Sequence, residues 1–157
     1  MEEGLSNLHD AYLSAHLMYI HMDRVPVGTV AGPPRSLVED RHRYERLWVA
    51  FLFVLVEAWK ANKMCAVTQW IQQVTDTAEL NGLLIEGSEN CHLARMEKCR
   101  NYMFHRGWRE YSDDGLWVPA LDSDFHRRLY TAFTKVLREA IGTLNAAKRR
   151  KLGQSRV

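Results

Sequence analysis

Apolar residues recur at steps of three and four along most of this chain, which is the period of an amphipathic helix. The first such segment covers residues 5–23, and its apolar positions include Leu5, Leu8, Tyr12, Ala15 and Tyr19. A second begins at Ser36-Leu37-Val38-Glu39, which has the Ser-x-x-Glu form of a capping box, and it continues to about Asn62. The prolines and glycines of residues 25–35 predict a loop between these two helices.

Within the second segment, Leu47 to Val56 form an unbroken apolar run. A helix that is apolar on all sides must be buried on most of them. The β-branched and aromatic residues of this run also suit a strand, but its helical flanks and the length of the segment favour a helix. We therefore predict a central buried helix here.

The second half of the chain predicts further helices. A third begins near Met64 and ends at the turn signal Asn81-Gly82, and Ser88 is a candidate N-cap for a fourth, which ends at Gly107. A last helix begins at Asp122 or Ser123 and continues to about Ala147.

Residues 107–121 predict a longer loop with a small hairpin around Asp114-Gly115. No repeat or low-complexity segment interrupts the pattern. The predicted fold class is therefore all-α, as an up-and-down bundle of about five helices.

The length of 157 residues suits one domain with a real core, which we assign to residues 1–147. Residues 148–157 predict a basic, disordered tail that contains Lys148-Arg149-Arg150-Lys151. Such a tail is most simply a solvated chain end, and its functional alternative is a weak contact with a phosphate backbone. The net charge of +2 does not predict the wide basic surface of a protein that coats nucleic acid duplexes.

The apolar run at Leu47 to Val56 is too short for a membrane span and stops at Glu57. The start of the chain, Met1-Glu2-Glu3-Gly4, lacks the basic and apolar regions of a signal peptide. The three cysteines (Cys65, Cys91 and Cys99) have no metal-binding spacing and fit reduced thiols. These features predict a cytoplasmic protein without a membrane partner, a metal or another cofactor.

The stretch Arg100-Asn101-Tyr102-Met103-Phe104-His105 places a guanidinium and an imidazole five residues apart. Histidine transfers protons near neutral pH, and arginine donates two parallel hydrogen bonds to phosphate while keeping its charge. Metal-free cleavage of RNA needs a base for the ribose 2′-OH, an acid for the leaving oxygen and a fixed cation for the phosphorane. The stretch therefore predicts catalysis by Arg100 and His105.

This motif resembles the Arg-Asn-x-x-x-His signature of the HEPN superfamily and matches it at Arg100, Asn101 and His105. The stretch from Tyr44 to Lys60 is similar to the second helix of that superfamily, which is apolar with one buried acid near its end. The resemblance implies a HEPN-like bundle over roughly residues 36–145. It also implies a metal-independent endoribonuclease that leaves a 2′,3′-cyclic phosphate and a 5′-OH.

The predicted roles follow from the motif and its surroundings. Arg100 clamps phosphate, His105 transfers protons, and Asn101 orients the backbone or holds the imidazole tautomer. Arg106 and Arg109 are assigned to substrate binding. Glu57 is costly to bury alone, so it is the predicted structural partner of an arginine from the motif helix, or else it lies at a solvated helix end.

In a regular helix Arg100 and His105 lie about 140° apart, so one helix alone makes a poor site. The resemblance implies a homodimer in which two copies of the motif face each other across a two-fold axis. The implied partners are RNA, a second copy and, as for some toxins of the superfamily, a nucleotidyltransferase-like antitoxin. One alternative is a non-catalytic HEPN-like module for dimerisation or partner binding, and another is a helical binding domain unrelated to HEPN proteins.

Overall fold

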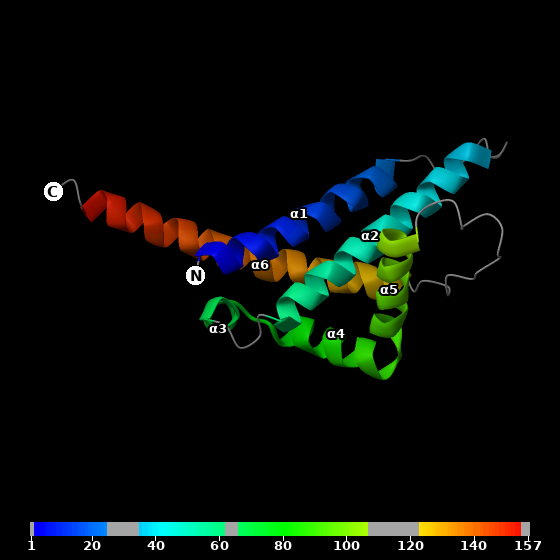
Figure 1. The fold of residues 1–157 in the computed structure, drawn as a ribbon. Coiled ribbons are helices and arrows are strands. Elements are labelled where there is room, and N and C mark those ends of the chain that lie inside the picture. Colours follow the sequence, from blue (N-terminus) through cyan, green and yellow to red (C-terminus); the bar gives the residue numbers. More distant parts are fainter. Residues whose placement is uncertain (1, 25–34, 62–65, 107–122, 155–157) are drawn as a thin grey trace.

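The computed structural model describes residues 2–24, 35–61, 66–106 and 123–154 (Figure 1). All regular structure in these residues is helical, which confirms the all-α class. The α-helices are α1 (Glu2–Arg24), α2 (Arg35–Ala61), α3 (Ala66–Val74), α4 (Ala78–Glu89), α5 (His92–Asn101) and α6 (Ser123–Gln154), and the π-helix η1 (Tyr102–Arg106) directly follows α5. The described residues thus form six α-helices, one more than the predicted number of about five.

Helix α2 lies at the centre of the described structure. Its neighbours include α1, α5 and α6, and it carries Trp48, Leu52 and Leu55, each at most 1% exposed. A helix enclosed on several sides needs apolar side chains all round, and the unbroken run provides them. The prediction of a central buried helix over Leu47 to Val56 is confirmed.

Helix α6 begins at Ser123, as the sequence predicts, and contributes one long apolar stripe to the core. The stripe repeats at three- and four-residue steps and contains Phe125, Leu129, Phe133, Leu137 and Ala140. The Phe133 ring meets Trp59 of α2 edge to face, with ring centroids 6.0 Å apart. This edge-to-face packing joins α6 to the central helix.

The predicted helix end at Asn81-Gly82 is wrong, because both residues lie inside α4. The break comes earlier, where the Asp76 carboxylate accepts a 3.0 Å hydrogen bond from the backbone N–H of Ala78 and forms a turn around Thr77, the N-cap residue of α4. A Cβ placed on Gly82 would have no atom within 4 Å, so this glycine marks neither a turn nor a close contact. Burial of leucines in α4 outweighs the weak helix preference of one glycine.

Ser88 is not an N-cap, because its hydroxyl donates back to the Leu84 carbonyl inside α4 at 3.0 Å. The turn into α5 instead passes through Cys91, whose φ of 59° is left-handed. Gly87 permits the close approach of α4, α5 and α6, since a Cβ there would lie 2.6 Å from the Phe125 ring. The predicted loop and hairpin of residues 107–121 lie outside the described residues.

The last helix does not end near Ala147, because α6 continues to Gln154. Residues 148–154, predicted to belong to a disordered tail, are therefore helical. Lys148, Arg149 and Arg150 are exposed on this extension. Figure 1 shows the C-terminal part of α6 projecting beyond the other helices.

Candidate active site

The motif lies where the chain changes from one type of helix to another. Arg100 and Asn101 are the last residues of α5, and the next five residues form η1. A π-helix closes its turns with i→i+5 hydrogen bonds, so each turn holds more residues than an α-helical turn, and such turns are frequent at functional sites. The ring of Phe104 in η1 packs edge to face on Phe51 of α2, with centroids 5.3 Å apart, and this contact joins the π turn to the central helix.

Arg100 is held against α2 by two contacts. Its Nη2 donates a hydrogen bond to Glu57 Oε1 at 2.5 Å, and its guanidinium carbon lies 5.6 Å from the centre of the Phe53 ring. Arg100 Nε is buried and has no hydrogen-bond partner among the described residues. The side chain is still 20% exposed. The two contacts therefore fix the orientation of the guanidinium, and its partial exposure leaves it accessible to an anion.

Glu57 has the arginine partner that the sequence predicts, but it is not the buried acid that the resemblance implies. Its side chain is 45% exposed, because it lies near the end of α2, beyond the enclosed part of the apolar run. An ion pair this exposed contributes at most about 1 kcal/mol to folding. Its main structural effect is to set the orientation of the Arg100 guanidinium.

The other predicted site residues are described only in part. Asn101 is exposed at the end of α5. His105 and Arg106 belong to the backbone of η1, but their side chains lie outside the described part of the structure, as does the whole of Arg109. The structure thus brings together Arg100 and Glu57, and the remaining roles stay predictions.

Phe53 lies beneath the Arg100 guanidinium and is not among the predicted site residues. Phe53 and Glu57 are four residues apart on α2 and therefore share one face of that helix. An aromatic ring one turn before an unexplained acid is a signal that sequence reasoning could have used. The two residues together give an arginine both a charge partner and a cation–π surface.

A buried thiol lies next to the motif arginine. The Cys99 Sγ donates to the Arg46 carbonyl of α2 at 3.5 Å, and burial raises the pKa of this thiol to about 12. The same loss of solvent lowers the pKa of the Arg46 guanidinium. Cys99 is therefore a protonated packing residue that ties α5 to α2, and not a nucleophile at neutral pH.

A second group of polar aromatic residues lies between α1 and α6. His16 Nδ1 and the Tyr130 hydroxyl share a hydrogen bond, and Tyr19 stacks on Tyr130 with centroids 4.8 Å apart. Burial raises the pKa of Tyr130, and the neighbouring Tyr12 raises it further by a smaller amount. His126 precedes Arg127 and Arg128 in the sequence, which favours a surface position, but it is only 2% exposed beside Trp48. Its position on the apolar stripe of α6 explains this difference.

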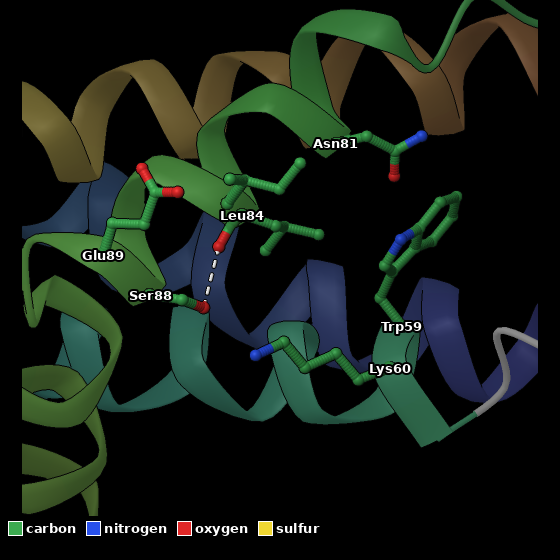
Figure 2. A pocket seen from close by; sticks show the side chains of 7 residues that line it. Trp59, Lys60, Asn81, Leu84, Ser88 and Glu89 are labelled. Atoms are coloured by element: carbon green, nitrogen blue, oxygen red, sulfur yellow. Dashed lines mark hydrogen bonds between the residues drawn. The ribbon is translucent and has the colours of Figure 1, made fainter.

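A pocket of about 580 Å³ opens between the end of α2 and α4 (Figure 2). Its lining combines the apolar Trp59, Leu84 and Ile85 with the polar Lys60, Asn81, Ser88 and Glu89. No motif residue with a described side chain lines this pocket, so it is separate from Arg100 and Asn101. Within the described ranges, no group of three or more His, Cys, Asp or Glu residues could hold a metal ion, and no helix is long and apolar enough to cross a membrane.

Comparisons with known proteins find no match to this chain among family models, curated proteins or solved structures.

Proposed function

We propose that this chain is a HEPN-like endoribonuclease that cleaves RNA without a metal ion. The observation that carries the proposal is the setting of Arg100 within an Arg-Asn-x-x-x-His motif. Glu57 and Phe53 fix the guanidinium at the end of α5 while a fifth of the side chain stays open to solvent. An arginine that only stabilised the fold would have no need of a histidine five residues later in a π turn.

In the proposed reaction a base, His105 in one copy, takes the proton from the ribose 2′-OH. The freed oxygen attacks the adjacent phosphorus, and the bond from phosphorus to the 5′-oxygen breaks. An acid, the second His105 or the same one in turn, protonates the leaving 5′-oxygen. The products are a 2′,3′-cyclic phosphate and a 5′-OH, and Arg100 stabilises the negative charge on the phosphorane between them.

The π turn supports this use of the motif. In an α-helix, positions 100 and 105 are about 140° apart around the axis, but a turn closed by i→i+5 bonds advances less per residue. The backbone of η1 therefore brings position 105 nearer to the angular position of Arg100 than a regular helix would. The motif spacing and the local backbone are in this way consistent with each other.

The proposed assembly is a homodimer whose two motif helices face each other in an up-and-down bundle of HEPN type. Phe104 supports this interface, because it is 44% exposed on η1 beside the motif. Across a two-fold axis the same patch meets itself, so two arginines and two histidines converge in one cleft. Arg106 and Arg109 are proposed to contact the RNA near that cleft, and Asn101 to orient the imidazole.

The biological role we propose is that of a toxin or RNA-directed defence effector, with a nucleotidyltransferase-like antitoxin as the partner. We propose that the exposed basic side chains of α6, Lys148, Arg149 and Arg150, contact the RNA backbone at a distance from the motif. A second candidate function is a non-catalytic HEPN-like dimerisation or partner-binding module. The exposed Phe104 favours it, since a large apolar side chain on the surface also suits an interface without catalysis.

The test measures cleavage of a single-stranded RNA in EDTA by wild-type protein and by Arg100→Ala and His105→Ala variants. Each variant is expected to lose activity by about a hundredfold or more. Arg95→Ala is the matched control, because Arg95 is an exposed arginine of the same helix α5 outside the motif. Circular dichroism checks that each variant keeps its helical structure. Mixed dimers of the two inactive variants report whether the motifs act within one copy or between copies.

The outcomes are distinct. Cleavage that EDTA abolishes would refute the metal-free mechanism. Wild-type protein that binds a partner but cleaves no RNA would replace the enzyme with the non-catalytic module. Equal losses in Arg95→Ala and Arg100→Ala would remove the special role of the motif arginine.

A further inference from the structure

Helix α1 has an apolar face on each side. Leu8, Ala15 and Met22 on its inner face are at most 4% exposed in the core. Leu13 and Leu17, at 39% and 53%, are exposed one turn apart. Only two other large apolar side chains of the described residues are as exposed, and they lie on other elements, one on α4 and one on η1.

The exposed leucines belong to a longer stripe, which we name the outer face of α1. It consists of Asp10, Leu13, Leu17, Ile20 and Arg24, which fall within about 80° of arc at 100° per residue. The centre of this arc is roughly opposite the inner face. The stripe is about 21 Å long, with an acid at one end and a base at the other. Asp10 and Arg24 are both exposed.

The charges at the two ends are placed symmetrically. Asp10 and Arg24 are each seven residues from Leu17, in opposite directions along the helix. A two-fold axis through Leu17 would therefore set Asp10 of one copy against Arg24 of the other, and the reverse. A parallel arrangement would instead set like charges against each other at both ends.

We propose that the outer face of α1 binds the same face of a second copy of this chain, antiparallel, with the two-fold axis at Leu17. One pair of helices buries little area, so the contact is at the weak end of specific interfaces. The residues of this contact are separate from the motif, which lies in α5 and η1, and both of these elements pack on α2. If the motif helices also pair and the two axes intersect at right angles, the two kinds of two-fold contact together close a tetramer.

The experiment is sedimentation velocity of the full chain over a series of concentrations in the micromolar range. Leu17→Glu puts two carboxylates against each other at the axis and removes the central apolar contact, so the Kd of this contact is expected to rise by about a hundredfold. The mass then halves, from dimer to monomer or from such a tetramer to the dimer of motif helices. Ile85→Glu is the matched control, since Ile85 is equally apolar, 60% exposed and located on α4, and it should leave the mass unchanged.

The charge pair tests the antiparallel register. Asp10→Arg alone and Arg24→Asp alone should each weaken the contact by about tenfold, because like charges then meet twice per dimer. The double variant exchanges the two charges and should restore the wild-type Kd within about threefold. These positions are on the surface, so circular dichroism should not change.

Several results would overturn the proposal. One is that Leu17→Glu has the same mass as the wild type. Another is that the wild type is a monomer at every concentration. A third is that the double variant associates more weakly than either single variant. In each case the outer face would have another occupant or none. RNA cleavage is not part of the measurement, so a failure of the proposed ribonuclease activity would leave this result intact.

Discussion

The three long helices and the short-helix segment of this protein are built in different ways. In α1, α2 and α6, apolar side chains repeat over many turns, and the loss of one position leaves the rest of the stripe in place. The segment from α4 to η1 depends on single residues instead: Gly87 where three helices meet, Cys91 in a left-handed conformation, and Cys99 against the Arg46 carbonyl. The candidate catalytic residue Arg100 lies in the short-helix segment, and its side chain contacts Glu57 and Phe53 of the long helix α2.

In the long helices, a core substitution should change the stability of the fold and not the chemistry of the motif. Tyr130→Ala removes the ring that stacks on Tyr19 and meets Trp48 edge to face at 6.0 Å. The free energy of unfolding should fall by about 3–5 kcal/mol, as for other large core aromatics, measured by urea denaturation. The proposed RNA cleavage, measured per folded molecule, should not change. A change below about 1 kcal/mol would mean that the Tyr130 ring contributes little to the packing of α6 against α1 and α2.

The short-helix segment predicts a dependence of stability on alkaline pH. Folding raises the pKa of Cys99 from 9.0 to about 12, so above pH 9 the unfolded chain binds fewer protons than the folded one. The free energy of unfolding therefore falls as pH rises from about 9 to 12, by up to about 1.4 kcal/mol per pH unit from this group.

Cys99→Ala removes this part of the slope, although it weakens the protein slightly at neutral pH. Urea denaturation near pH 8 and near pH 10.5 compares the two proteins over the window in which the thiol of the unfolded chain ionises. Parallel pH profiles would show that Cys99 is as solvated as a free thiol, and that the contact with Arg46 does not seal the base of the motif helix.

The smallest effect comes from a matched pair of glycines in α4. At Gly87 a methyl group would meet Phe125 at 2.6 Å and Leu93 at 3.0 Å, so Gly87→Ala should lower stability by about 1–3 kcal/mol. Gly82 has open space around it, and Gly82→Ala should raise stability by about 0.5–1 kcal/mol through helix preference. Thermal denaturation of both variants measures the difference. A Gly87 variant as stable as wild type would show that the three-helix contact can adjust.

The sequence predicted the long helices because their information is repeated. The Ser-x-x-Glu signal, the apolar run of α2 and the start of α6 at Ser123 all appear in the printed chain, and the structure agrees with them to within a few residues. The end of α6 was harder, since the apolar period stops after Leu144 while the helix continues. Nothing in residues 145–154 breaks a helix except Gly153, so this charged segment is helical although its composition is typical of a tail.

The short-helix segment was predicted less well for a physical reason. Asn81-Gly82 is a turn signal in the sequence, but burial of the neighbouring leucines favours a helix there. That burial depends on partners far away in the chain. The arginine partner of Glu57 follows from the cost of a lone acid after an apolar run. Its partial exposure does not, because it depends on where α5 crosses α2.

A π turn is in effect an α-helix with one residue inserted, and η1 carries this insertion inside the motif. Spacing along the chain and position around the axis are therefore no longer equivalent across residues 102–106. In terms of descent, a relative with a regular helix at this place would present the same arrangement with three residues between arginine and histidine. An alignment of the two would need a gap of one residue within the most informative stretch of the chain.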